Sequence, residues 1–298
     1  MEEKPQRESA YPSALAVGTA WEAEHARGWI AVPSESDDKY SRGVLGMVTG
    51  SARYPGAAVL GAEAAARTGV GMIRYLGAER AAQEVLRRRP EIVSAPGRVQ
   101  AWLLGSGMDA GDRDDDDLRR LREALDDGTP LVIDAGALDL VMRASGPAVI
   151  TPHFRELSRA LGAAADDGAP TPDPDEIRQD PGGWAERAAS ALGATVLLKG
   201  HTTHVATPDG SRVTVTAGPS WLATAGSGDV LGGVLGALVA THAGAIREHG
   251  HEALAALAAT AAWVHGRAGE AASGGGPVTA LDVAEAVPGV LRTLLAGS

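Results

Sequence analysis

From residue 39 onward, the hydrophobic pattern alternates between two periods. Short apolar runs that end in glycine or a polar residue predict buried strands, and longer stretches with apolar positions three and four apart predict helices. The strand-type runs are residues 44–50, 71–77, 101–107, 130–136, 148–153 and 195–200. Helical stretches such as 55–69 and 79–89 separate the first of them. This alternation predicts βαβ units on a largely parallel sheet, and active sites in open α/β sheets lie at the carboxyl ends of the strands.

The two ends of the chain depart from this alternation. Residues 204–218 hold two strand-type runs around a Pro-Asp-Gly turn at 208–210, which predicts an antiparallel hairpin appended to the sheet. The rest of the C-terminal part has helical spacing and predicts closing helices. Residues 1–38 are polar and irregular, so we expect a tail or a loosely docked arm. One domain is expected at 39–298.

Composition narrows the class of protein. A chain of 298 residues that is 44% hydrophobic can bury a large core. A net charge of -11 argues against nucleic acid or an anionic membrane as partner, so any phosphate must be held locally. The absence of cysteine excludes disulfides and thiolate chemistry, and no segment resembles a signal peptide or a membrane span. We expect a soluble, cytoplasmic protein.

The acidic run at 112–117 has two interpretations. Several adjacent carboxylates can bind a divalent metal, but this run leads directly into the helical sequence LRRLREAL. We favour a solvated loop that places acidic charge at a helix N-terminus.

The most informative segment for chemistry is residues 217–240, which contain the sequence AGSGD. This glycine-bearing turn opens into an apolar helix, so backbone N–H groups at Gly226, Ser227 and Gly228 are predicted to form an anion hole. Asp229 in the first turn is placed to act as a general base on a substrate hydroxyl while a phosphoryl group binds the N–H groups. The alternative is that Asp229 only caps the helix and complements its dipole. The motif alone does not decide between them.

Five further segments stand in chain order with this one. They are residues 43–71, 103–109, 131–138, 150–162 and 196–210. They contain a glycine-serine loop, a Gly-x-Gly turn, an Asp-Ala strand end, a Thr-Pro-His-x-x-Glu segment and a Lys-Gly-x-x-Thr segment. The Gly-x-Gly-Asp turn at a late helix start resembles the ribokinase-like superfamily. All six segments together resemble the ADP/ATP-dependent NAD(P)H-hydrate dehydratases, from about residue 39 to the end of the chain.

The resemblance implies a ribokinase-like α/β fold, with a mostly parallel sheet covered by helices on both faces. It implies a lyase that dehydrates the S-epimer of hydrated NADH and NADPH, with ADP or ATP as co-substrate and Mg²⁺. Asp229 would be the catalytic base. Contacts to the hydrated dinucleotide would come from Ala57, Gly107, His153 and Asp229. Contacts to the nucleotide would come from Lys199, Gly200, His201, Thr202, Thr203 and Gly228.

Several of these residues also have a purely structural interpretation. Ala57 suits tight helix packing, and a lone histidine such as His153 often serves as a structural hydrogen-bonding group. Lys199 suits a nucleotide phosphate, the alternative being a surface salt bridge. Asp134 can hold Mg²⁺ through water or cap the following turn, and the sequence does not choose. The metal ligands stay unknown.

The sequence departs from the family pattern at two places. Ser106 stands where the family usually has proline, and Ala217-Gly218 stands where a Gly-Asn pair is common. Two alternative functions stay open: a ribokinase-like kinase of a vitamin-precursor alcohol, and a non-catalytic nucleotide-binding regulator. The Thr-Pro-His-x-x-Glu and Lys-Gly-x-x-Thr segments favour the dehydratases. Members of the family often form homo-oligomers and are often fused to an epimerase domain, for which we expect no room here.

Overall fold

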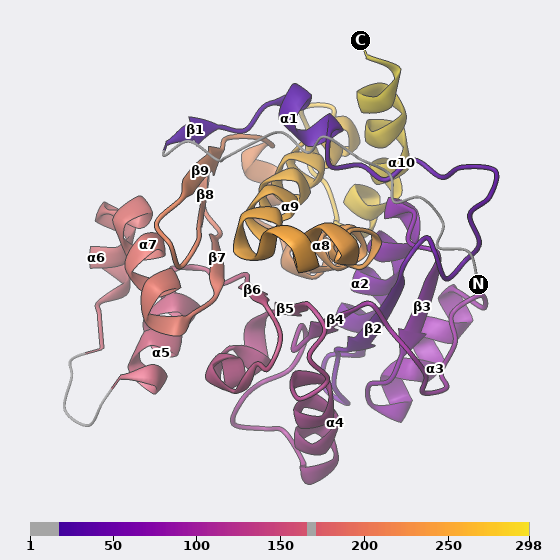
Figure 1. Ribbon diagram of the computed structural model, residues 1–298, viewed down its shortest axis with the longest axis horizontal. Helices are drawn as coiled ribbons and strands as arrows, with labels where there is room; N and C mark the ends of the chain where they lie inside the picture. Colours follow the sequence, from indigo (N-terminus) through magenta and orange to yellow (C-terminus); the bar gives the residue numbers. More distant parts are fainter. Residues whose placement is uncertain (1–17, 166–170, 298) are drawn as a thin grey trace.

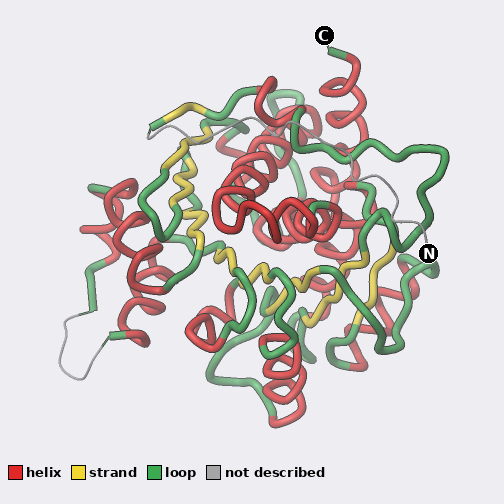
Figure 2. The backbone as a smooth tube through the Cα atoms, viewed as in Figure 1, coloured by secondary structure: helices red, strands yellow, loops and turns green. Residues whose placement is uncertain are grey.

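The computed structural model describes residues 18–165 and 171–297, and their strands form one sheet of nine. Figure 1 shows the chain, and Figure 2 shows the strands as one twisted strip between helices. The spatial order is β1-β9-β8-β7-β6-β5-β4-β2-β3. The strands are β1 (Thr19–Ala20), β2 (Val44–Val48), β3 (Met72–Tyr75), β4 (Ala101–Leu104), β5 (Leu131–Ile133), β6 (Ala148–Ile150), β7 (Thr195–Leu198), β8 (Thr203–Ala206) and β9 (Arg212–Val215). Only β8 runs antiparallel to its neighbours.

This topology confirms the predicted α/β fold. Every strand-type run contains a strand, and β8 and β9 form the predicted hairpin. One face of the sheet is covered by α2 (Pro55–Thr68), α3 (Glu79–Arg88), α8 (Ser227–Thr241), α9 (Ala243–Ser273) and α10 (Ala280–Ala296). The other face carries α4 (Asp115–Leu125), the 3₁₀ helix η1 (Ala135–Arg143), α5 (Phe154–Ala164), α6 (Pro174–Gln179) and α7 (Pro181–Leu192). Two short elements are α1 (Ala23–Arg27) and η2 (Ser220–Leu222).

Helix α8 lies close to α2 because glycines meet at their contact. A Cβ atom added to Gly233 would lie 2.2 Å from the carbonyl oxygen of Gly61, a distance that no side chain tolerates. The helix is buried on nearly every side, including at Val230, Val234 and Leu238. The residues that meet the sheet are glycines, since a Cβ on Gly236 would lie 3.1 Å from the side chain of Leu45. The glycine-spotted sequence thus allows a tightly packed helix whose N-terminus is held beside the carboxyl ends of the strands.

The described part of the N-terminal arm, residues 18–38, is attached more firmly than its polar sequence suggests. β1 adds a short parallel strand to β9. Trp21 and Trp29 are each only 4% exposed, and the indole N–H of Trp21 donates to the hydroxyl of Thr260 at 3.2 Å. Two indole rings bury enough apolar surface to hold a segment whose other residues are polar. Residues 1–17 lie outside the described residues.

The acidic run takes the form of a loop that feeds a helix. The Asp114 carboxylate caps α4 by accepting the backbone N–H of Asp117 at 2.7 Å. Within residues 18–165 and 171–297, no group of three or more His, Asp or Glu side chains is arranged to hold a metal ion. The run thus places acidic charge at a helix N-terminus as predicted, but Asp117 is only 7% exposed and is not solvated.

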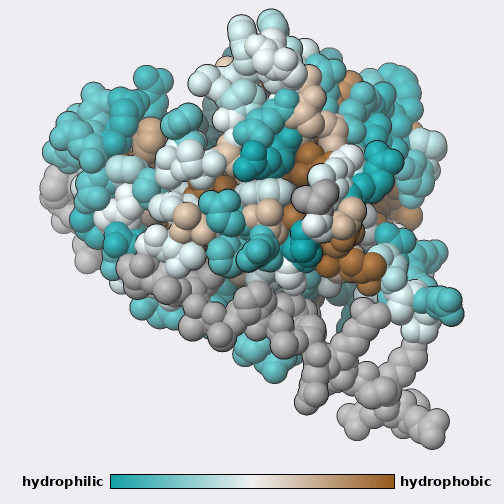
Figure 3. All heavy atoms as spheres, turned by 90° about the horizontal axis from the view of Figure 1, so that it is seen from above, coloured by the Kyte–Doolittle hydropathy of each residue, from teal (hydrophilic) through white to brown (hydrophobic). Residues whose placement is uncertain are grey.

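The surface seen in Figure 3 is mostly hydrophilic, with hydrophobic patches between polar groups. In the described parts of the chain, no single helix is long and apolar enough to span a membrane, although α8 and α9 together reach that composition across a 118° bend.

Glu63 in α2 is a buried carboxylate that is paired with three arginines. Its side chain is 0% exposed. Its carboxylate accepts hydrogen bonds from Arg67 and Arg89 at 2.6 Å and from Arg88 at 3.2 Å. Burial alone would raise the pKa of Glu63, but the three guanidinium groups lower it to about 2. This cluster joins α2 to the end of α3.

We expect Glu63→Gln to lower the free energy of unfolding by about 1–3 kcal/mol at neutral pH, because it removes the counter-charge of three guanidinium groups whose side chains are 23–39% exposed. Since the folded-state pKa lies below the ordinary value of 4.5, the carboxylate stabilises the fold above that value and stops doing so as the pH falls towards 2. The difference between the two proteins should therefore shrink in acid.

Urea unfolding at several pH values measures this difference. Glu285→Gln is the matched control, since Glu285 pairs with Arg88 at 2.6 Å on the exposed rim of the same cluster. Glu285→Gln should lower the free energy of unfolding by less than about 1 kcal/mol. Equal losses for both variants would contradict the assignment of Glu63 as the centre of the cluster.

Candidate functional site

The carboxylate of Asp134 joins four neighbouring strand ends. Asp134 follows β5 and is 3% exposed. Its Oδ2 accepts the hydroxyl of Ser106 after β4 at 3.0 Å. Its Oδ1 accepts the hydroxyl of Thr151 after β6 at 2.8 Å and the ammonium of Lys199 after β7 at 3.1 Å. Because these strands are adjacent in the sheet, one buried side chain sets the relative positions of their loops.

Two open questions from the sequence are answered by these contacts. Asp134 makes no side-chain bond that caps η1, so the capping alternative is wrong. Ser106 is buried and supplies a hydrogen bond that proline cannot make. Its carbonyl also accepts the backbone N–H of Gly50 at 2.6 Å, which ties the loop after β4 to the loop after β2. The departure from the family pattern at this position thus adds a contact to the site.

Lys199 forms a partly buried ion pair rather than a surface salt bridge. Its side chain is 22% exposed, and its Nζ lies 3.1 Å from Asp134 and 3.6 Å from Glu156. A Cβ atom built on Gly228 would lie 3.5 Å from the same Nζ. Burial alone would lower the pKa of Lys199, but the neighbouring carboxylates raise it. A fixed ammonium group therefore stands at the start of α8.

His153 has a structural role at the N-terminus of α5. Its Nδ1 accepts the backbone N–H of Glu156 at 3.2 Å, and the Glu156 carboxylate accepts the backbone N–H of His153 at 2.8 Å. This reciprocal capping box fixes both side chains. The imidazole is nevertheless 47% exposed and lines a cavity, and burial of the remainder lowers its pKa. The capping bond thus orients a ring that stays open to a ligand.

Asp229 lies in the first turn of α8, after Gly226 in the left-handed conformation with φ of 87°. Burial raises the pKa of Asp229 to about 7, with further raising from Asp134 and Glu156 and lowering from Lys199. A carboxylate that titrates near neutral pH is suited to accept a proton from a substrate.

The backbone of the same turn differs from the predicted anion hole in one detail. The N–H of Ser227 already donates to the carbonyl of Thr224 at 3.3 Å. In the described structure, the N–H groups of Gly228 and Asp229 have no backbone acceptor, as expected for the first turn of a helix. Of the three predicted donors, only Ser227 is therefore engaged within the turn, and Asp229 offers a free N–H group that the sequence did not indicate.

A cavity of about 700 Å³ opens beside this turn. Of the residues expected to hold a nucleotide, Lys199, Gly200, His201, Thr203 and Gly228 line it. Thr202 is not among the lining residues, and its hydroxyl lies 3.1 Å from that of Thr216. The remaining lining residues are 217–220 and 222–224 together with Leu231, Ala262 and His265. The sequence marked residues 217 and 218 only as a departure from the family pattern, and Ala262 and His265 carry no motif that indicates them in advance.

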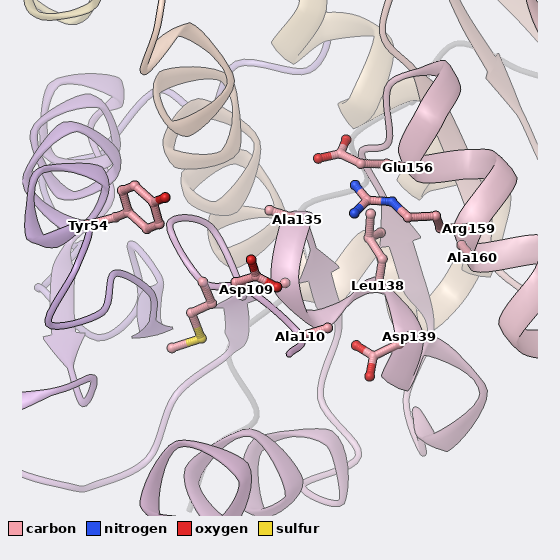
Figure 4. A pocket seen from close by; sticks show the side chains of 11 residues that line it. Tyr54, Asp109, Ala110, Ala135, Leu138, Asp139, Glu156, Arg159 and Ala160 are labelled. Atoms are coloured by element: carbon pink, nitrogen blue, oxygen red, sulfur yellow. The ribbon is translucent and has the colours of Figure 1, made fainter. Parts of the chain in front are cut away.

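A second cavity, of about 300 Å³, lies on the other side of Glu156. Figure 4 shows Tyr54 and Arg159 on opposite sides of it, with Asp109 and Ala135 between them. Ala135 is the one described non-glycine residue with positive φ, at 44°. Such a strained conformation directly after Asp134 is typical of a functional site.

The predicted substrate contacts Ala57 and Gly107 lie together next to this second cavity. A Cβ atom on Gly107 would be 2.3 Å from the Cβ of Ala57, so a larger residue at either position would push the loops apart. Gly107 also needs its φ of 69°. Ala57 therefore has the structural packing role that the sequence left open. This contact lies beside the loop that contains Tyr54.

Known proteins with similar sequences share one description. The model of a family described as NAD(P)H-hydrate dehydratase matches residues 45–288. The bifunctional NAD(P)H-hydrate repair enzyme Nnr of Mycobacterium tuberculosis H37Rv is 44% identical over 222 residues, which is 70% of this chain and 43% of that protein. The chain thus spans less than half the length of these bifunctional relatives. The ADP-dependent (S)-NAD(P)H-hydrate dehydratase of Neisseria meningitidis serogroup B is 32% identical over 281 residues, or 89% of this chain and 84% of that protein.

Solved structures show the same fold. The ADP/ATP-dependent NAD(P)H-hydrate dehydratase of Bacillus subtilis, co-crystallised with ATP/Mg²⁺, superposes with a TM-score of 0.78 and 24% identity. The match covers 94% of this chain and all of that chain. A ribokinase-like superfamily protein from Enterococcus faecalis gives a TM-score of 0.75 at 20% identity.

The raised pKa of Asp229 generates a prediction about stability. A carboxyl group whose folded pKa lies above its ordinary value of 3.8 favours the folded state in acid, and this contribution is lost as the pH rises to about 7. We expect Asp229→Asn to be more stable than the parent by about 1–3 kcal/mol at about pH 8, after allowance for partial exposure. The gain should shrink as the pH falls towards about 4. Urea unfolding across this range tests it, and a gain that does not vary with pH would contradict the raised pKa.

Proposed function

The chain belongs to the NAD(P)H-hydrate dehydratase family, and from this premise we propose that it converts the S-epimer of hydrated NADH and NADPH back to NADH and NADPH, using ADP or ATP. One observation carries the proposal. Asp229, with a pKa raised to about 7, lies in the helix turn that offers free N–H groups, and the ammonium of Lys199 lies next to the same turn. A base beside an anion hole is what phosphorylation of a substrate hydroxyl requires.

We assign one substrate to each of the two cavities. We place the nucleotide in the cavity of about 700 Å³, with its terminal phosphates at the start of α8 and against Lys199. We place the hydrated nicotinamide beside Asp229, where His153 borders the cavity of about 700 Å³, and the remainder of the dinucleotide towards Ala57 and the cavity of about 300 Å³. The Asp134 network lies between the two cavities. It keeps Lys199 and the loops on either side at a constant separation.

The first chemical step transfers a phosphoryl group. Asp229 accepts the proton of the ring hydroxyl while that oxygen attacks the terminal phosphorus of the nucleotide, and the bond to the bridging oxygen breaks. The N–H groups of Gly228 and Asp229 and the ammonium of Lys199 offset the charge on the transferred group. The products of this step are a phosphate ester of the hydrated ring and AMP or ADP.

The second step eliminates that phosphate. Hydroxide is a poor leaving group, but phosphate leaves when the ring nitrogen donates its lone pair to the adjacent carbon. Loss of a proton from the next ring carbon restores the dihydronicotinamide. Overall, the elements of water leave the hydrated cofactor and end in hydrogen phosphate, one phosphoanhydride bond of the nucleotide is broken, and no electron is transferred. His153 contacts the ring in this arrangement, oriented by its bond to Glu156.

Mg²⁺ fits this site as a companion of the nucleotide. The described residues provide no cage of three or more ligands, and both oxygens of Asp134 already accept hydrogen bonds from the protein. Mg²⁺ commonly binds through phosphates, waters and only one or two carboxylates. The ligands of the ion would therefore come mainly from the nucleotide phosphates and from water. When bound, the ion lowers the charge on the phosphates.

The substrate assay is the direct test. Purified protein given hydrated NADH, Mg²⁺ and either ADP or ATP should restore the absorbance of the reduced nicotinamide and release one phosphate for each cofactor repaired. Asp229→Asn should retain nucleotide affinity and lose at least about 100-fold in turnover, since a general base acts in the transition state. Formation of a stable ester from a vitamin-precursor alcohol, without cofactor repair, would instead assign the chain to the kinases. Tight nucleotide binding without turnover on either would favour a regulator.

A second prediction concerns Lys199. Lys199→Met should raise the KM for the nucleotide, because an ammonium contact to the phosphates is lost. It should also move the acidic limb of the pH–rate profile to higher pH, since Lys199 lowers the pKa of Asp229. Lys39→Met is the control, because Lys39 is exposed and distant in sequence from Lys199. It should change neither the KM for the nucleotide nor the pH–rate profile. An unchanged profile in Lys199→Met would separate Lys199 from the titration of Asp229.

A further inference from the structure

A buried histidine lies against the phosphate-binding turn and has no part in the mechanism above. His265 is in the middle of α9 and is 9% exposed. Its Nε2 lies 3.1 Å from the hydroxyl oxygen of Ser227, the first residue of α8. Both residues line the cavity assigned to the nucleotide, and α8 and α9 pack side by side there. The two side chains thus form a buried hydrogen bond in the wall of this cavity.

Ser227 has only its hydroxyl left to offer a ligand. Its backbone N–H is engaged by Thr224, whereas the two N–H groups that follow are free. The hydroxyl lies two residues before Asp229 and immediately before the free N–H of Gly228. A hydroxyl proton directed into the cavity would therefore be a third donor to a phosphoryl group bound at this turn.

The state of the imidazole decides where that proton goes. Burial lowers the pKa of His265 to about 4, so the ring carries a single proton at neutral pH. If that proton is on Nε2, the ring donates to Ser227 and leaves the hydroxyl proton free to point at the phosphate. If it is on Nδ1, the hydroxyl donates to the ring and turns its lone pairs towards the phosphate, which repels them. Only the first arrangement is compatible with an anion at this position.

We propose that His265 is a positioning residue that donates from Nε2 to Ser227 and thereby makes the Ser227 hydroxyl a third donor of the anion hole. The inference deepens the proposed function, since it rests on a phosphoryl group being bound at the start of α8. The hydroxyl strengthens binding of the transferring group, and the histidine acts only through the serine.

Histidine NMR gives a test that does not depend on turnover. The ¹⁵N spectrum of the full chain should show His265 as the Nε2-protonated tautomer, without titration between about pH 6 and 8, and addition of ADP with Mg²⁺ should leave that tautomer in place. An Nδ1-protonated ring in the presence of ADP would overturn the proposal. Because this NMR measurement uses the unaltered protein, its result remains valid even if a variant fails to fold.

Variants supply the functional half of the test. Ser227→Ala and His265→Leu should each lower kcat by roughly 10- to 100-fold, the range expected for a lost hydrogen bond to a charged group. The double variant should be no worse than either single variant, since both remove the same donor. His265→Gln, whose amide N–H can replace Nε2–H, should recover most of the loss. Additive effects, or no rescue by glutamine in a folded protein, would overturn the pairing.

The matched control is His242, a buried histidine at the far end of α8 whose Nδ1 lies 2.9 Å from the carbonyl of Leu238. His242→Gln should alter stability without changing kcat. If the parent protein itself shows no turnover, the proposed function fails, whereas an active parent with an unaffected Ser227→Ala variant overturns only this inference.

Discussion

The site depends on one buried carboxylate that accepts three hydrogen bonds. Asp134 receives donors from the ends of the strands on both sides of its own, and neither oxygen is left without a partner. A buried charge is tolerated only when it is paired and fully hydrogen-bonded, so this arrangement permits little movement of the loops it joins. The strained backbone at Ala135 is held in place by the same network.

The electrostatics of the turn at the start of α8 follow from this arrangement. Asp134 and Glu156 hold the ammonium of Lys199 next to α8, and the same two carboxylates raise the pKa of Asp229. Lys199 acts in the opposite direction, so the pKa of about 7 is a balance between burial, two negative charges and one positive charge. Among the described residues, the pKa of Asp229 is thus set without a titratable group hydrogen-bonded to its carboxylate. It depends instead on a helix start that is held rigidly beside the strand ends.

The rigidity of this helix start comes from packing together with one hydrogen bond. The glycines of α2 and α8 allow the two helices to touch through their backbones, and α8 is buried on nearly every side. Ser227 is connected to α9 through His265, so the turn is held from both sides. The closing helices therefore form part of the site, although the motifs that first suggest the function lie in the loops.

The sequence by itself determined the strand and helix order, the hairpin and the glycine turn before α8, because each of these depends on a local period or on a residue with special backbone freedom. It also indicated Asp229 and Lys199, which stand at element ends in recognisable motifs. Only the tertiary structure decided the contacts between residues far apart in the chain. Examples are Ser106 on Asp134, Ser227 on His265 and the buried tryptophans of the N-terminal arm. No local pattern encodes such pairs, because they arise from which strand ends and helix faces the topology places side by side.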